Sequence, residues 1–458
     1  MLAGTIALGA SAQDAAPGDM LPTTFVAPTG LVPANGMLFF GAHQPSTGPE
    51  LWVTDGTQDG TRIVKDIRPG FRGSYPSVLT RFGNVVFFAA NDGVSGLELW
   101  SSDGTSSGTK LFKDIYEGAG DSIPSEFTVV GDTLYFAAND GTHGFELWKT
   151  TATPESAAMV LDIHSGPSGS MPRHLTAVGD VLFFSAAESV HGRELWISKA
   201  AATGAKRVID INPGAADSMP ESLIELDGSL FFVALDGRHG AELWKSDGTA
   251  GGTKMIKDIH AGRESARPRY LTKLGLELCF QASDGRRGYE LWKTDGTRRR
   301  TALVKDIGLG AENSLPSFMT AVNGMLYFAA TDRVHGVELW KSDGSERGTV
   351  LVKDVHVGVG SSSPGQISRF GDRLLFAAGD GSHGWEVWMS DGSAEGSVMV
   401  SDLRSGPESS YPNRFTAFNG IVAFVADDDY GNERLWLMDP SASRVALVGA
   451  PLMKRLQP

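Results

Sequence analysis

Three sets of side chains in the sequence could do chemistry, and two of them recur at fixed places. Histidines followed by glycine stand five residues before a tryptophan, at His143, His191, His239, His335 and His383. Aspartates stand three residues after the same kind of tryptophan, at Asp55, Asp103, Asp247, Asp295, Asp343 and Asp391. Histidine changes charge near neutral pH, and carboxylate oxygens are the ligands that calcium prefers. The spacing therefore predicts a pH-sensitive face for the first series and a candidate calcium site for the second.

Each of these series also has a plainer interpretation. An aspartate before Gly-Thr caps its own turn through a side-chain hydrogen bond, and no segment matches the dense Asp-x-Asp-x-Asp calcium loop. The histidines would lie too far apart for one tetrahedral metal unless they lay near an axis, and they could simply pack on a neighbouring repeat. Ser95, Arg287 and Thr47 take the same position in other repeats. We therefore expect no cofactor, with calcium left as the alternative.

The third set is a break in the charge pattern. Residues 263–305 hold eleven basic and five acidic residues, in a chain whose net charge is −14. Its loop arginines are Arg286, Arg287, Arg298, Arg299 and Arg300. Such a patch could dock an anionic partner, such as an acidic polysaccharide, or could be a solvated cluster. Trp385, next to Gly384, could stack on a sugar ring or fill a gap in the fold.

The elements that position these side chains follow from an internal repeat, the first feature to seek in a long sequence. Nine of the ten tryptophans are spaced by 48 residues: Trp52, Trp100, Trp148, Trp196, Trp244, Trp292, Trp340, Trp388 and Trp436. A phenylalanine precedes each by twelve residues and a proline precedes each by twenty-four. The chain from Pro28 onward is therefore nine copies of one unit, with no insertion or deletion.

One copy, residues 76–123, shows the expected local structure. Residues 77–82, 85–90, 97–101 and 110–115 are rich in β-branched and aromatic residues, and Gly-Asn or Asp-Gly turns separate them. This pattern predicts four strands in an antiparallel meander. No window has a helical apolar period, so the protein is predicted to be all-β.

Four strands in 48 residues make one blade of a β-propeller. We predict nine four-stranded blades in a single domain over residues 25–458, with tryptophan and phenylalanine filling the layers between blades. An open β superhelix is the alternative. The first and last copies keep the same phase, so a strand exchange between the chain ends is possible but not required.

The repeat core reads Glu242-Leu243-Trp244-Lys245-Ser246-Asp247-Gly248-Thr249, followed by Gly252-Thr253 and Lys257-Asp258-Ile259. It closely resembles the ELWxxDGT repeat family, tandem repeats of bacterial proteins that are often secreted or on the surface. The resemblance implies a propeller-like array, usually without an assigned activity, and supplies no catalytic residue. Thr151 and Lys199 replace the turn aspartate in two copies, and Arg434 replaces the motif glutamate in the ninth.

The ends and the composition bear on location. Ala10-Ser11-Ala12 fits a signal-peptidase site, so residues 1–12 are predicted to be a truncated signal peptide and residues 13–24 a disordered lead-in. A flexible leader is the other interpretation. One cysteine excludes a disulfide scaffold, and no apolar run is long enough to span a membrane. The acidic balance argues against nucleic acid. We expect a secreted, cell-surface or periplasmic protein.

No catalytic motif appears in the sequence, and every loop keeps its length through the copies. A catalytic centre needs unlike groups that converge on one spot. The sequence therefore predicts no catalytic residues and no enzyme activity. It predicts a monomeric ring that acts as a non-catalytic binding or scaffolding propeller for extracellular carbohydrate or protein partners. The alternatives are a hydrolase or lyase that acts on polysaccharide and a structural surface-layer component.

Overall fold

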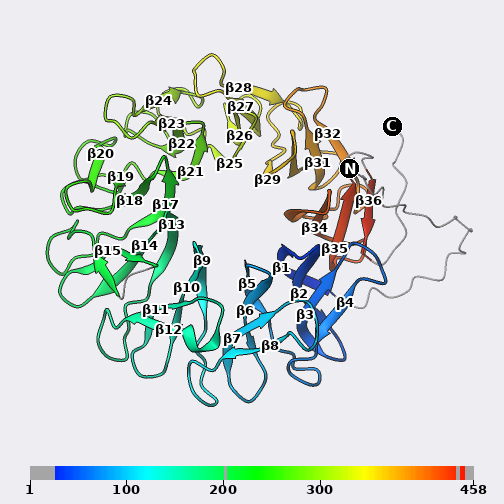
Figure 1. Cartoon of the computed structure of the whole chain (residues 1–458). Helices are drawn as coiled ribbons and strands as arrows, with labels where there is room; N and C mark the ends of the chain where they lie inside the picture. The colour runs from blue at the N-terminus through cyan, green and yellow to red at the C-terminus, as the bar shows by residue number, and fades with distance from the viewer. Residues whose placement is uncertain (1–25, 201–203, 440–443, 449–458) are drawn as a thin grey trace, which may run out of the picture.

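The computed structural model describes residues 26–200, 204–439 and 444–448. It consists of nine four-stranded antiparallel sheets set as blades around a central opening (Figure 1). We number the blades 1 to 9 along the chain. The predicted nine-bladed β-propeller is confirmed. The predicted signal peptide and lead-in lie outside the described residues.

Each blade takes its strands in sequence order from the central opening to the rim (Figure 1). The first, innermost strands are β1 (Val26–Ala34), β5 (Ser77–Phe82), β9 (Ser125–Val130), β13 (Arg173–Val178), β17 (Glu221–Leu226), β21 (Arg269–Leu274), β25 (Ser317–Val322), β29 (Gly365–Phe370) and β33 (Asn413–Phe418). The second strands are β2 (Met37–Gln44), β6 (Val85–Asn91), β10 (Thr133–Asn139), β14 (Val181–Glu188), β18 (Ser229–Ala234), β22 (Glu277–Ala282), β26 (Met325–Thr331), β30 (Arg373–Ala378) and β34 (Ile421–Asp427).

The two outer strands follow the same order. The third strands, which carry the repeated tryptophan, are β3 (Gly48–Thr54), β7 (Leu97–Ser102), β11 (Phe145–Thr150), β15 (Gly192–Lys199), β19 (Glu242–Ser246), β23 (Glu290–Thr294), β27 (Val337–Ser342), β31 (Glu386–Ser390) and β35 (Glu433–Asp439). The fourth strands, at the rim, are β4 (Arg62–Lys65), β8 (Lys110–Lys113), β12 (Ala158–Leu161), β16 (Ala205–Arg207), β20 (Lys254–Lys257), β24 (Ala302–Lys305), β28 (Val350–Lys353), β32 (Val398–Ser401) and β36 (Arg444–Leu447).

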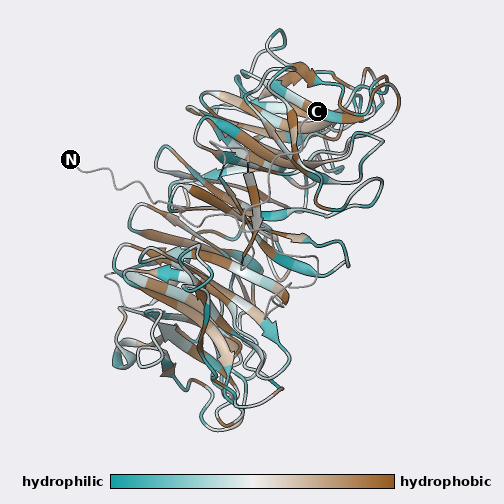
Figure 2. Ribbon diagram, turned by 90° about the vertical axis from the view of Figure 1, so that its right-hand side faces the viewer, coloured by the Kyte–Doolittle hydropathy of each residue, from teal (hydrophilic) through white to brown (hydrophobic). Residues whose placement is uncertain are grey.

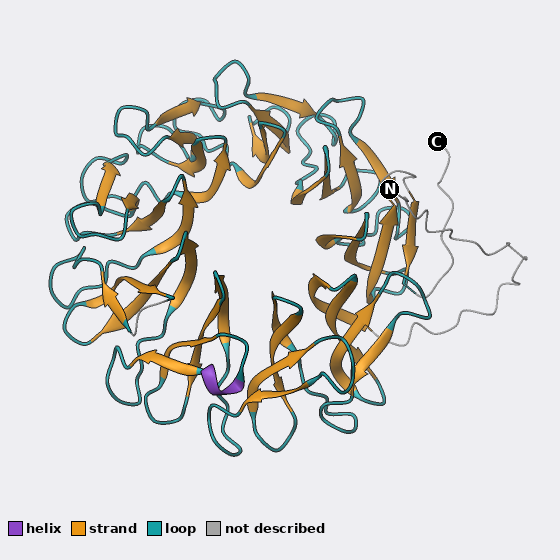
Figure 3. Ribbon diagram, viewed as in Figure 1, coloured by secondary structure: helices purple, strands orange, loops and turns teal. Residues whose placement is uncertain are grey.

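The predicted strand bounds in blade 2 need one substantial correction. The fourth strand ends at Lys113 rather than at residue 115, because Asp114 leaves the ladder and accepts a hydrogen bond from the Gly118 backbone N–H at 3.3 Å. The second and third strands each run one residue further than predicted. The one helix among the described residues is a single 3₁₀ turn at Pro154–Ser156 in blade 3 (Figure 3). No helix in the described ranges is long and apolar enough to cross a membrane.

The hydrophobic core lies between neighbouring blades. In the layer between blades 1 and 2, Phe39 and Val53 of blade 1 pack with Phe88 and Trp100 of blade 2. Apolar strands run through the interior of the blades and hydrophilic residues gather at the loops (Figure 2). The prediction that the repeated tryptophan and phenylalanine fill the inter-blade layers is confirmed.

The ring closes between blade 9 and blade 1 through the same kind of layer. Phe40 and Trp52 of blade 1 pack with Phe418 and Leu437 of blade 9. The Arg414 side chain also donates a hydrogen bond to the Pro28 carbonyl at 2.6 Å. Because β1 pairs within blade 1 and β36 pairs within blade 9, no strand is exchanged across this seam in the part of the chain that the structure describes.

Candidate functional site

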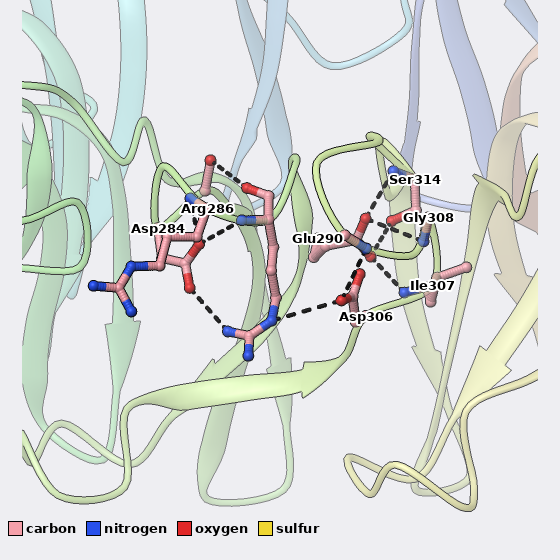
Figure 4. Close-up of polar contacts among 10 residues, drawn as sticks. Asp284, Arg286, Glu290, Asp306, Ile307, Gly308 and Ser314 are labelled. Carbon is pink, nitrogen blue, oxygen red and sulfur yellow. Dashed lines mark hydrogen bonds and ion pairs between the residues drawn. The ribbon is translucent and has the colours of Figure 1, made fainter.

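Blade 6 shows how the rim loops of a blade are held together (Figure 4). Arg287 donates to Asp284 in its own loop at 2.9 Å, and its Nε lies 3.6 Å from Asp306, which follows β24. Asp284 also accepts the backbone N–H groups of Arg286 and Arg287. One guanidinium therefore ties the loop between the second and third strands to the loop that leads into the next blade.

A buried glutamate lies beside this contact (Figure 4). Glu290 is fully buried and accepts hydrogen bonds from the Ile307 N–H at 2.8 Å and from the N–H and hydroxyl of Ser314 at 2.9 and 2.6 Å. Burial raises the pKa of Glu290, and these hydrogen bonds offset part of the rise. The carboxylate thus anchors the loop between blades.

The same glutamate recurs in eight blades and is 0% exposed in each: Glu50, Glu98, Glu146, Glu194, Glu242, Glu290, Glu338 and Glu386. Burial raises the pKa to about 7 in four of them: Glu50, Glu194, Glu242 and Glu386. In blade 9, Arg434 stands at this position and its Nε lies 3.0 Å from Asp428. The buried glutamates are part of the scaffold that fixes the loops, since their acceptors are all used within their own blade.

Five blades place a histidine where blade 6 has Arg287. Each imidazole Nδ1 lies 2.7–2.9 Å from a carboxylate three residues earlier, in the pairs His143–Asp140, His191–Glu188, His239–Asp236, His335–Asp332 and His383–Asp380. The hydrogen bond to aspartate raises the pKa of His143, His239, His335 and His383. These side chains are 30–37% exposed, so solvent protons reach them.

A pocket among the described residues lies at the rim between blades 5 and 6. We call it the basic groove. It has a volume of about 580 Å³ and runs along β20 of blade 5 to the third-strand turn of blade 6. Its lining residues are His239, Lys254, Met255, Ile256, Lys257, Asp258, Gly296, Thr297 and Arg298. Four of these can carry positive charge and one carries negative charge.

The cations of the basic groove differ in how they are used. Lys257 donates to the Thr301 carbonyl at 2.7 Å and lies 5.8 Å from the centre of the Trp292 ring, so it joins the two blades. Within the described ranges, no carboxylate lies within ion-pairing distance of Lys254 or Arg298. An anion that enters the groove would therefore meet two cations whose charge no carboxylate neutralises.

The aspartates after the tryptophans cap their own turns. Asp247 accepts the Thr249 N–H at 2.9 Å and the Thr249 hydroxyl at 2.7 Å, and the Gly252 backbone covers it so closely that a Cβ there would lie 2.0 Å from Oδ1. The same pair of turn bonds recurs, with serine replacing threonine in two copies, at Asp55, Asp103, Asp295, Asp343 and Asp391. Over the part of the chain that the structure describes, no three His, Cys, Asp or Glu side chains are grouped to hold a metal.

The structure brings only two of the sequence candidates together in the groove, His239 and Arg298. Arg300 pairs with Asp295 at 3.7 Å. Trp385 lies in blade 8, half-buried, with its ring 6.3 Å from that of Tyr411. Arg286 and Arg299 do not line the groove. The predicted arginine patch is therefore dispersed along blade 6. One of its arginines, Arg298, lines the same pocket as His239.

Lys254 and the role of the buried glutamates were not predicted from the sequence. Lys254 follows Trp244 by ten residues, and Lys110 and Arg62 take the same place in other repeats, so it did not stand out. The glutamates had a usable signal, because a serine follows the motif glutamate by 24 residues in seven copies. That constant spacing marks the hydroxyl that bonds to the carboxylate, as in Glu98 with Ser122.

Neither a protein-family model nor a curated protein matches the sequence, so the resemblance to the ELWxxDGT repeat family stays a prediction. Solved structures do match in shape. A puromycin hydrolase mutant aligns over 72% of this chain and 54% of its own, at 15% identity and a TM-score of 0.41. A structure from a study of two prolyl endopeptidases aligns over 90% of this chain and 54% of its own, at 10% identity and a TM-score of 0.45.

The propeller domain of the trilobed protease from Pyrococcus furiosus aligns over 71% of this chain and 96% of its own, at 12% identity and a TM-score of 0.37. The present chain spans little more than half the length of the hydrolase and endopeptidase chains. At this level of identity the likeness assigns no activity to the chain.

Two predictions are corrected by this finding. The chain was expected to be a non-catalytic binding or scaffolding propeller for carbohydrate or protein partners, and not an enzyme. The matching solved chains come from a puromycin hydrolase and from peptidases, so neither expectation is kept, and the likeness in fold does not assign their activity to this chain. The expectation of no catalysis was based on loops of equal length in every repeat, and equal loop length is not enough to exclude an enzyme.

Proposed function

We propose that the propeller binds a small anionic molecule in the basic groove between blades 5 and 6. The observation that carries this proposal is the convergence of Lys254, Arg298 and His239 on one pocket of about 580 Å³. That volume is in the range of small-molecule sites, which hold ligands by a few placed polar groups. The ligand class is a carboxylate, sulfonate or phosphate compound, because these are the groups that arginine and lysine recognise.

The two free cations would act differently on such a ligand. The guanidinium of Arg298 presents a planar fork of donors that suits two oxygens of one anionic group, whereas Lys254 acts as a point charge. Asp258 lies at the far end of β20 and repels anions there. The anionic group is therefore expected at the Lys254 and Arg298 end of the groove, with the rest of the ligand along Met255 and Ile256.

The test uses naphthalene disulfonate, a fluorescent probe whose sulfonate groups stay ionised across the working pH range. Binding is measured by the change in probe fluorescence for the wild type and for the Lys254→Gln and Arg298→Gln variants. Each substitution should weaken binding about tenfold, the order of magnitude for one lost charge-assisted hydrogen bond.

Lys110→Gln is the matched control, because Lys110 has the same repeat position in blade 2. It should bind the probe as the wild type does. Equal binding by all four proteins, or none by the wild type, would overturn the proposal.

We also propose that the protein is exported, as the resemblance and the Ala10-Ser11-Ala12 sequence support. Expression of the full chain in a bacterium, followed by fractionation and N-terminal sequencing, tests this. A mature chain that begins at Gln13 outside the cytoplasm is the expected result. Intact chain retained in the cytoplasm would contradict it.

A further inference from the structure

His239 is the only histidine that lines the basic groove, and it lies between two carboxylates. Its Nδ1 is 2.8 Å from Asp236, and its Nε2 is 4.0 Å from Asp258. One blade further on, Arg287 makes the same bridge with distances of 2.9 and 3.6 Å. A permanent cation therefore fits this position, and both ends of the side chain face an acceptor.

The charged groups around His239 come from three elements. Asp236 belongs to its own loop, Glu242 opens β19, and Asp258 follows β20. The other cations that line the groove are Lys254 and Lys257 on β20 and Arg298 in the turn of blade 6. The carboxylates are the direct contacts of the imidazole, and the hydrogen bond with Asp236 raises the pKa of His239 above 6.5.

Protonation changes what this side chain can do. A neutral imidazole has one N–H, and when Asp236 accepts it, the Nε2 lone pair faces the Asp258 carboxylate. A protonated imidazole donates from both nitrogens, so it can hold Asp236 and Asp258 together. It also adds one positive charge to the groove and offsets the negative charge of Asp258, which would otherwise repel a bound anion.

We propose that anion binding in the basic groove is linked to a proton on His239, so that the protonated protein binds the anion more tightly. This inference rests on the proposed function of the groove. By linkage, a bound anion also makes His239 harder to deprotonate. The groove would thus take up its ligand in mildly acidic surroundings and release it as the pH rises.

The experiment measures the Kd of naphthalene disulfonate at about pH 5.5 and about pH 8.5. The wild type should bind about twofold more weakly at the higher pH, the effect of one unit charge roughly 10 Å away, the length of β20, in a watery site. His239→Arg, which copies Arg287 of blade 6, should bind tightly at both pH values. His239→Gln should bind weakly at both.

His383→Gln is the control, because His383 has the same aspartate bond in blade 8 but does not line the groove. It should keep the wild-type pH dependence. Binding that is equally tight at both pH values in the wild type, or a pH dependence that survives in His239→Gln, would overturn this inference alone. Absence of binding at both pH values, with no effect of Arg298→Gln, would overturn the proposed function instead.

Discussion

The basic groove has a counterpart at the rim between blades 2 and 3, and the two differ sharply. Both lie between the fourth strand of one blade and the third-strand turn of the next. The counterpart has a volume of about 230 Å³ against about 580 Å³, and Pro154 stands where the groove has Arg298. Lys110 and Lys254 have the same repeat position, so one cation is common to both.

The two pockets differ because a few residues differ between blades that share the same backbone arrangement. Blade 3 has Thr151 in place of the turn aspartate, and its chain forms the 3₁₀ turn Pro154–Ser156 there. In blade 2, Phe112 stands where blade 5 has the smaller Ile256. Equal loop length therefore does not make these two junctions equivalent, since a few side chains decide whether a junction holds a small pocket or a larger one lined by several cations.

The largest expected effect tests whether the charge of the groove does the binding. The double variant Lys254→Glu, Arg298→Glu should lose at least about a hundredfold in affinity for naphthalene disulfonate, since two attractive charges become repulsive. Lys110→Glu in blade 2 should leave affinity unchanged. Fluorescence titration at low salt checks both, and equal loss in the two proteins would remove the distinction between the junctions.

The second prediction compares the pH response of the two regions. The pKa of Glu242 is raised from 4.5 to about 7 by burial, and that of His239 is raised by Asp236, so both groups stabilise the folded state at low pH. Their contribution is lost as the pH rises through the folded pKa values, between about 5 and 8. Blade 2 has Ser95 in place of the histidine, so it lacks the histidine's contribution to stability at low pH.

Hydrogen exchange at two equivalent amides measures this difference. The Ile259 N–H donates to Glu242 at 3.0 Å and the Ile115 N–H donates to Glu98 at 2.7 Å. Protection of Ile259 should fall more than that of Ile115 over this pH range, because blade 5 also loses the stabilisation that its histidine supplies. In His239→Ser, the protection of the two amides should change equally with pH. An equal change in the wild type would contradict the prediction.

Much of the fold could be predicted from the sequence because the same pattern of tryptophan, phenylalanine and proline occurs nine times. The fixed spacing of tryptophan, phenylalanine and proline gave the blade number and the content of the inter-blade layers. The groove did not follow, because it depends on which residues of one repeat face the next. Lys254 and Arg298 are 44 residues apart, and only the ring geometry places them in one pocket. Asp258 and His239 likewise meet only across a folded blade.

The third prediction concerns the smaller pocket between blades 2 and 3, which one substitution should convert into a weak binding site. Pro154→Arg places a guanidinium near Lys110, as Arg298 lies near Lys254. The smaller volume and Phe112 remain, so a gain of only about threefold over background is expected, within the range for an exposed ion pair. Titration in the Lys254→Glu, Arg298→Glu background isolates the new site, and affinity as high as in the basic groove would show that volume is unimportant.

The smallest difference is expected at the turns, which are alike in the two regions. Asp103→Ala and Asp247→Ala each remove the two hydrogen bonds that the N–H and hydroxyl of the threonine two residues later donate. Each should lower the free energy of unfolding by about 1 kcal/mol. The two losses should agree within error in urea unfolding. If added calcium stabilised the wild type but neither variant, these aspartates would be metal ligands rather than turn caps.

The seam between blades 9 and 1 has a mechanical consequence. The other eight junctions are crossed by the chain. Among the described residues, this one is held by a layer that includes Phe40, Trp52 and Phe418 and by side-chain hydrogen bonds such as Arg414 to Pro28. A pulling force applied between β1 and β36 would load this layer directly, because these strands belong to the two blades that it joins. The layer between blades 9 and 1 is therefore the place where the ring would open under such a force. Blade 5, whose rim strand lies on the far side of the central opening, would bear the least of that load (Figure 1).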